Sequence, residues 1–131
     1  MISLNLLREH LSKKKISCVE LCKKLIYRIE SNKNLNAFLD FKPEKVIEEA
    51  NKIDKKINDG DKRPLLGIPI AHKDIFVTKD YTTTAGSKML ENYKSPFDAT
   101  VVAKLKDDGA ITLGKLNCDE FAMGSSNENS F

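Results

Sequence analysis

RPLLGIPIAHKDIF, residues Arg63–Phe76, is a mostly apolar run. Lys73 lies among apolar residues of the kind that are usually buried. The pattern predicts a buried strand that ends at His72–Asp74. Burial disfavours the charged form of a lysine and lowers its pKa, so Lys73 could act as a neutral base near pH 7. The alternative is a strand-end lysine whose stem is covered while its ammonium group lies in solvent or pairs with Asp74.

The composition fits one globular domain of 131 residues, with 40% hydrophobic and 31% charged residues. The formal net charge of +3 is spread along the chain instead of being gathered in one block. A dedicated nucleic-acid binder usually shows a basic stripe or tail, so this charge is a weak argument for a nucleic-acid partner.

The cysteines and the N-terminal sequence predict a cytoplasmic protein. The three cysteines are an odd number without a disulfide-like framework, which indicates a reducing compartment. The N-terminus lacks a basic segment followed by an apolar one, as a signal peptide would have. No apolar run approaches the roughly 18 residues that a membrane span needs. We therefore expect neither secretion nor membrane insertion.

The first 60 residues are predicted to be mainly helical. Apolar residues at helical spacing predict a short helix over Ser3–Leu11. Ser17 and Glu20 have the spacing of a capping box, which opens a helix over about Cys18–Glu30. Cys22 lies on the apolar face of this helix and is interpreted as a core residue.

A strand and a third helix complete this half of the chain. The short apolar run AFLDF, Ala37–Phe41, indicates a strand or an extended segment. Pro43 suits the first position of an amphipathic helix, and Gly60 ends it. Each of these helices needs an apolar surface to pack against.

From Pro64 onward the pattern changes to α/β. We expect a strand over Leu65–Ala71, a helix over about Ala99–Asp108 that is capped by Asp98, and a second strand over Ala110–Leu113. A strand, a helical crossover and another strand form a βαβ unit. The predicted fold is therefore α/β, with a mostly parallel sheet covered by helices.

Three loop-like stretches follow the predicted strands or connect them: residues 72–74, 82–87 and 117–126. Ligands of open α/β sheets bind at the carboxyl ends of the strands, where these stretches are expected to converge. Gly86 and Gly124 lie beside hydroxyl residues, which permits either close approach of a ligand or simple turn formation.

Several kinds of site find no support in the sequence. There is no Gly-rich nucleotide-binding motif. Cys18 and Cys22 have no second pair of ligands at metal-binding spacing, so no metal site is predicted. His10 and His72 are the only histidines, and His72 is interpreted as a hydrogen-bonded residue at a strand end. A serine hydrolase built on this chain would therefore use a lysine as its base.

Nearly the whole chain resembles the amidase signature family. The resemblance is carried by PLLGIPIAHKDIF at 64–76, TTTAGSKMLENYKSPFDATVVAKL at 82–105 and GAITLGKLNCDEFAMGSSNENSF at 109–131. It is strongest to the branch that supplies ammonia for tRNA-dependent amidation. Ile75 and Cys118 stand where many relatives have asparagine and methionine, and neither is a reacting group.

The resemblance implies an incomplete amidase signature fold. Residues 1–131 would be the N-terminal part of a single amidase domain, with 1–60 mainly helical and 61–131 forming the start of the α/β core. The family uses a Ser, cis-Ser, Lys triad, and Lys73 falls on its lysine. Both serines follow the segment that matches NENSF, so they are expected beyond residue 131. A chain of 131 residues is therefore expected to be inactive by itself.

The resemblance also assigns binding residues and partners. Met123, Gly124 and Ser125 would line the amide-binding site, and Asp74 would support Lys73. The complete enzyme would hydrolyse glutamine and pass ammonia to a B subunit that amidates Glu-tRNA(Gln), with a small C subunit completing the complex. No cofactor is expected in this chain, because ATP and Mg²⁺ would be used by the complex.

Two other functions stay open. A stand-alone amidase of the same family would act on another amide without partner subunits. A non-enzymatic α/β module that binds a partner is expected if the gene ends at Phe131.

Overall fold

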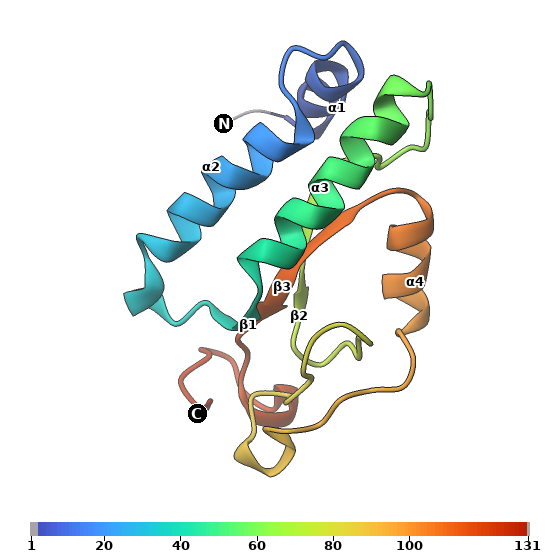
Figure 1. Ribbon diagram of the computed structural model, residues 1–131. Helices are drawn as coiled ribbons and strands as arrows, with labels where there is room; N and C mark the ends of the chain where they lie inside the picture. The colour runs from blue at the N-terminus through green and yellow to red at the C-terminus, as the bar shows by residue number, and fades with distance from the viewer. Residues whose placement is uncertain (1–2, 131) are drawn as a thin grey trace.

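The computed structural model describes residues 3–130, which form a small sheet with helices packed against it (Figure 1). The elements in chain order are α1 (Leu4–Ser12), α2 (Cys18–Glu30), β1 (Phe38–Phe41), α3 (Pro43–Asn58), β2 (Pro69–Lys73), α4 (Thr100–Asp107) and β3 (Ile111–Leu116). Short 3₁₀ turns occupy Lys33–Leu35, Lys88–Leu90 and Glu120–Ala122. The predicted α/β class is confirmed.

The predicted capping box of the second helix is confirmed, and the first helix has a cap that was not predicted. Ser3 caps α1 by accepting a hydrogen bond from the Leu6 amide. In α2, the Ser17 hydroxyl accepts from the Glu20 amide, and the Glu20 carboxylate accepts from the Ser17 amide. A partner from α3 adds to this cap, because Asp54 accepts hydrogen bonds from two more amides at the start of α2. The N-terminus of α2 is thus held by its own sequence and by a neighbouring helix.

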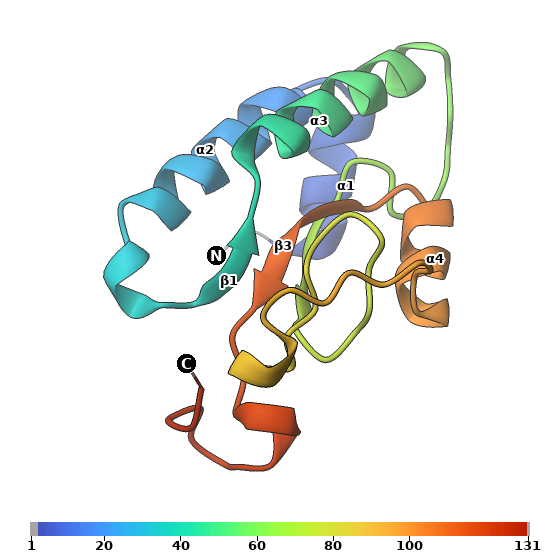
Figure 2. The same cartoon turned by 60° about the horizontal axis from the view of Figure 1, so that its bottom comes forward.

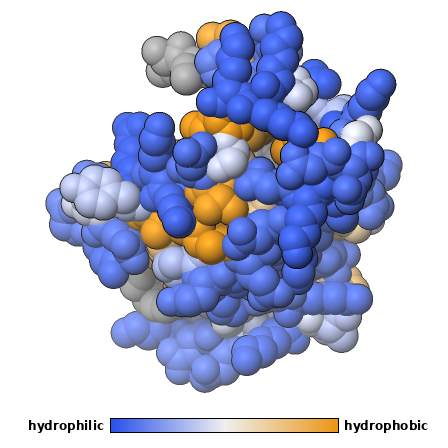
Figure 3. All heavy atoms as spheres, turned by 45° about the horizontal axis from the view of Figure 1, so that its top comes forward, coloured by the Kyte–Doolittle hydropathy of each residue, from blue (hydrophilic) through white to orange (hydrophobic). Residues whose placement is uncertain are grey.

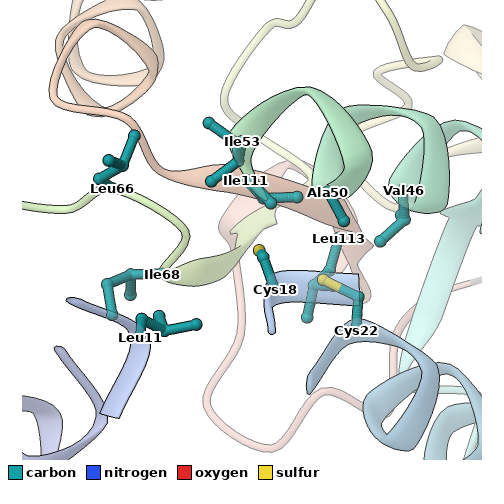
Figure 4. Close-up of a cluster of buried hydrophobic side chains, with 10 residues drawn as sticks. All are labelled: Leu11, Cys18, Cys22, Val46, Ala50, Ile53, Leu66, Ile68, Ile111 and Leu113. Carbon is teal, nitrogen blue, oxygen red and sulfur yellow. The ribbon is translucent and has the colours of Figure 1, made fainter. Parts of the chain in front are cut away.

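The core lies between the first three helices and the sheet (Figure 4). Cys22 is fully buried there, as predicted, and so is Cys18. The helices contribute small and branched side chains that meet residues of β3 and of the segment before β2. The cluster consists of Leu11, Cys18, Cys22, Val46, Ala50, Ile53, Leu66, Ile68, Ile111 and Leu113. Burying each large apolar side chain contributes about 1.5–3 kcal/mol, which is why the amphipathic helices gather on the sheet.

The sheet has the strand order β1-β3-β2. Strands β2 and β3 are parallel and connected through α4, so the predicted βαβ unit is confirmed. Strand β1 pairs antiparallel with β3, which makes the described sheet mixed. Mixed sheets of this kind commonly carry an antiparallel edge strand, and no local sequence signal gives the direction of such a strand.

The boundaries of the two parallel strands differ from the prediction. Strand β2 begins at Pro69, because the predicted strand residues Leu65–Gly67 form a turn instead. The amides of Leu65 and Gly67 donate to the carbonyls of Asp108 and Gly109, just after α4. Tertiary hydrogen bonds to this helix end therefore replace ladder bonds in the apolar segment. Strand β3 extends to Leu116, beyond the predicted end at Leu113.

The predicted role of Asp98 as the cap of α4 is wrong. The helix begins at Thr100, its N-cap is Ala99, and no side chain caps it. The Asp98 carboxylate instead accepts from the Lys79 amide at 2.8 Å and lies 2.9 Å from Lys106 Nζ. A long-range amide and a lysine thus compete successfully for the carboxylate that local sequence would assign to the helix.

Hydrophilic residues cover most of the face that Figure 3 shows, and hydrophobic residues are visible between them. None of the helices within residues 3–130 combines the length and apolar character that crossing a bilayer requires.

Candidate active site

The three predicted loops converge beyond the carboxyl ends of β2 and β3, as expected. In Figures 1 and 2 the yellow connection after β2 and the red segment after β3 lie side by side at the end of the molecule away from α1. The Asp74 amide donates to Leu116 O at 2.9 Å, which joins the two strand ends. The Ala85 amide donates to Asp74 O at 3.1 Å, and the Phe121 amide donates to Ala85 O at 2.8 Å. Main-chain hydrogen bonds therefore connect all three loops.

Lys73 is the last residue of β2 and lies opposite Leu116 in the parallel ladder. Its side chain is exposed within residues 3–130, which matches the alternative of a strand-end lysine and not that of a buried one. Successive strand residues point to opposite faces of a sheet. His72 and Asp74 are buried, and Lys73 between them projects to the other side. The role of Lys73 as a base stays a prediction.

The buried lysine at this site is Lys115, which the sequence reasoning missed. Its side chain is fully buried, and its Nζ lies 2.9 Å from Asp74 Oδ1. The ammonium group also donates to the Thr83 hydroxyl at 2.7 Å and to the Thr82 carbonyl at 3.3 Å. Burial lowers the pKa of Lys115, while the ion pair with Asp74 opposes this shift. The sequence signal for Lys115 is its position inside the mostly apolar run ITLGKL, all of which forms β3.

The Asp74 carboxylate contacts both Thr84 and Lys115. One carboxylate oxygen accepts from the Thr84 amide at 2.8 Å and from the Thr84 hydroxyl. The other oxygen makes the ion pair with Lys115, although no well-aligned hydrogen bond reaches it within residues 3–130. The suggested pairing of Asp74 with Lys73 is therefore replaced by pairing with Lys115. The predicted supporting role of Asp74 toward Lys73 stays a prediction.

Gly86 shows why the loop after β2 can pack against the loop after β3. A Cβ atom at this position would lie 2.5 Å from the Cys118 carbonyl oxygen, and the φ angle of Gly86 is +67°. Two requirements, a left-handed backbone and a close approach, thus select glycine here. Nearby Ala85, Phe121 and Ala122 also have positive φ angles. Strained backbone of this type often marks a functional site.

The predicted amide-binding residues lie on the loop after the Glu120–Ala122 turn. Met123 is 79% exposed, and Gly124 and Ser125 are exposed as well. Gly124 packs against Asp119, whose Cγ atom would lie 2.3 Å from a Cβ at position 124. The hydrogen bonds through Ala85 and Phe121 connect this loop to the Lys73 strand end only indirectly. Whether these residues contact an amide stays a prediction.

Burial shifts the pKa values of two side chains near the strand ends, His72 and Cys118. His72 is buried, and its Nε2 lies 3.2 Å from the Thr112 hydroxyl, so its predicted role as a hydrogen-bonded residue is confirmed. Burial lowers the pKa of His72, and the charge of Lys115 acts in the same direction. Burial raises the pKa of the Cys118 thiol, and the Asp74 charge adds to this effect. Both groups therefore favour their neutral forms at neutral pH.

A hollow of about 380 Å³ opens beside Asp74. Side chains of both charges surround it, including Asp40, Lys42 and Lys94. Its size suits a small polar molecule. No cluster of three or more His, Cys, Asp or Glu side chains able to hold a metal ion occurs in residues 3–130.

An α/β core with strained loops gathered at a lysine-bearing strand end is typical of an enzyme active site. The family model described as Amidase matches residues 20–131, and the chain therefore belongs to the amidase family. The chain is similar to the A subunit of the glutamyl-tRNA(Gln) amidotransferase of Ralstonia nicotianae, with 54% identity over 128 residues, 98% of this chain and 26% of that protein. The A subunit of the glutamyl-tRNA(Gln) amidotransferase of Janthinobacterium sp. is 59% identical to the chain over 121 residues, which are 92% of this chain and 25% of that protein. The chain thus spans about a quarter of the length of these curated relatives.

Solved structures support the same family. One is described as an unexpected vestigial protein complex that reveals the evolutionary origins of an s-triazine catabolic enzyme. It matches with a TM-score of 0.91 and 34% identity, over 98% of this chain and 29% of that chain. The native peptide amidase of Stenotrophomonas maltophilia matches with a TM-score of 0.84 and 31% identity, over 94% of this chain and 26% of that chain. The described fold is thus part of an amidase fold.

Proposed function

We propose that this chain is the lysine-bearing, N-terminal part of the glutamine-hydrolysing component of a tRNA-dependent amidotransferase. The observation that carries the proposal is the 54% identity, over 98% of this chain, to the A subunit of a glutamyl-tRNA(Gln) amidotransferase. The complete enzyme would release ammonia from glutamine for the conversion of Glu-tRNA(Gln) to Gln-tRNA(Gln) in the cytoplasm.

In the proposed mechanism, neutral Lys73 accepts a proton from a serine supplied by a later segment of the complete protein. That serine in turn accepts the proton of a second, nucleophilic serine, which attacks the carboxamide carbon of glutamine. The proton held by Lys73 returns through the relay to the departing nitrogen. Ammonia leaves, and water hydrolyses the acyl-enzyme to give glutamate. Met123, Gly124 and Ser125 would bind the amide, and Asp74 would hold the strand end on which Lys73 lies.

The partners follow from the same proposal. A B subunit would receive the ammonia and amidate Glu-tRNA(Gln), using ATP and Mg²⁺, and a C subunit would complete the assembly. These ligands would contact mainly the partner surfaces. The role of this chain is thus to supply ammonia.

The central test is Lys73→Met in the complete protein, assembled with its B and C subunits. Loss of the only base in the relay should abolish glutaminase turnover, because removal of an essential catalytic group costs several orders of magnitude. Lys79→Met is the matched control, since Lys79 is an exposed lysine a few residues away. It should retain wild-type turnover. Near-normal glutamine hydrolysis by Lys73→Met would remove the lysine from the mechanism.

A stand-alone amidase is the second candidate, favoured by the 31% identity to a peptide amidase. A glutaminase assay with and without the B and C subunits separates the two. Hydrolysis of diverse amides by the complete protein without its partners would support the stand-alone enzyme. Reading the gene past codon 131 tests both: an open frame with a Gly/Ser-rich segment supports an enzyme, and a stop codon supports a non-enzymatic binding module.

A further inference from the structure

The Asp74–Lys115 ion pair is the most deeply buried charged contact of the site. Both side chains have zero exposure, and Asp74 Oδ1 lies 2.9 Å from Lys115 Nζ. The two residues come from the ends of adjacent parallel strands. Burying two charges is costly, and the attraction between them often only offsets that cost. Stability alone therefore does not explain why charged residues occupy these positions.

The geometry of the pair indicates what it does. Asp74 accepts from the Thr84 amide and hydroxyl, and Lys115 donates to the Thr83 hydroxyl and the Thr82 carbonyl. Three consecutive loop residues are thus held by one ion pair. Removal of either charge would leave the other buried without its partner and would release the loop.

The loop that the pair holds reaches the rest of the site. Ala85, the next residue, bonds both to the Asp74 carbonyl and to the Phe121 amide. Ser87 donates through its hydroxyl to Glu120. The loop residues held by the ion pair are therefore hydrogen-bonded both to the strand end of Lys73 and to the segment that precedes Met123–Ser125.

We infer that the Asp74–Lys115 pair is a positioning element for amide hydrolysis. It fixes the positions of the Thr82–Ser87 loop and of the strand end of Lys73 relative to Met123–Ser125, the proposed amide-binding residues. The inference rests on the proposed function. The Lys115 side chain has zero exposure within residues 3–130, so we assign it as a positioning residue and not a catalytic one. An error of about 1 Å in the placement of catalytic groups can lower turnover by about 100-fold.

The test uses the complete protein in its assembly and compares Lys115→Met with Lys106→Met. Lys106 is a fair control because it is a partly buried lysine that pairs with Asp80 and Asp98 outside the site. We expect Lys115→Met to lower kcat for glutamine by about 100-fold, with a smaller change in KM. Hydrogen exchange of the Thr84 and Ala85 amides should accelerate in the same variant. Lys106→Met should change neither quantity.

A double variant keeps the test informative if Lys115→Met does not fold. Asp74→Asn with Lys115→Gln removes both charges but retains groups that can bond each other and the threonines. It should show higher kcat and slower exchange at Thr84 than either single variant. A wild-type kcat in Lys115→Met, or a lost kcat with protected Thr84 and Ala85 amides, would overturn the inference. A wild-type assembly that hydrolyses no glutamine refutes the proposed function instead, and exchange still reports whether the pair anchors the loop.

Discussion

Gly86 illustrates how single residues determine the packing of the candidate site. Its backbone is left-handed, and the Cys118 carbonyl leaves no room for a side chain. Gly60, after α3, has a similar positive φ of +87° but nothing within 4 Å of the Cβ position. Substitution at Gly60 would therefore cost only the free energy of a left-handed backbone, whereas substitution at Gly86 would also cost the steric clash with Cys118.

Substitution of both glycines by alanine tests this interpretation. Gly60→Ala should cost about 1–2 kcal/mol, the penalty of a left-handed alanine. Gly86→Ala should cost about 1–3 kcal/mol more, because the methyl group collides with backbone. Denaturation of the complete protein measures the totals, and exchange of the Phe121 amide reports the loop locally. Equal effects of the two substitutions would show that the contact with Cys118 is unimportant.

At the scale of elements, helices α2 and α3 are joined by a cap that spans 35 residues or more of sequence. Asp54 of α3 accepts from the Cys18 amide at 2.7 Å and from the Val19 amide at 3.1 Å. The capping box of α2 was recognisable because its partners are three residues apart. The contribution of Asp54 was not, because it depends on how the helices pack.

The Asp54 cap gives a prediction for helix stability. Asp54→Ala should destabilise the start of α2 by about 0.5–2 kcal/mol, the usual value of a lost N-cap. Exchange of the Cys18 and Val19 amides is the direct measurement. Glu48→Ala on the same helix is the control, since it removes only an exposed pair with Lys52, which is worth little. Similar exchange rates in the two variants would count against the cap.

At the scale of the whole molecule, residues 3–130 leave apolar surface and strand edges open. Strands β1 and β2 form the two edges of the described sheet. A hollow of about 740 Å³ lies between the end of α2 and the sheet, and its apolar lining includes Leu25, Ile29, Leu35, Phe38, Phe41 and Leu113. Open edges and apolar hollows favour association with other chains.

A chain limited to residues 1–131 should therefore be poorly soluble or partly disordered, and it should hydrolyse no amide. We expect it to bind a hydrophobic dye such as ANS more strongly than the complete protein, because the hollow stays open. Dye fluorescence, thermal melting and a glutaminase assay check these points. A cooperative melt without dye binding would contradict the prediction of poor folding, and amide hydrolysis would contradict the prediction of inactivity.

The helices and the convergence of the loops were predictable because their causes are local or follow from topology. Apolar periodicity specifies α1, α2 and α3, and a capping box marks the start of α2. A parallel βαβ unit brings the strand ends together whatever the exact boundaries. Asp98 shows the limit of this reasoning. Its local signal predicts a helix cap, but the distant partners Lys79 and Lys106 bind the carboxylate.

The sequence by itself determined the α/β class, the amphipathic helices and the place of Lys73 at a strand end, because each depends on residues close together in the chain. Only the tertiary structure decided which lysine is buried. Alternation would place Lys115 on the same side as Ile111 and Leu113, but the ladder with β2 shifts register between Thr112 and Gly114. This irregularity breaks the alternation before Lys115. Lys115 therefore reaches Asp74, and Lys73 projects to the opposite side.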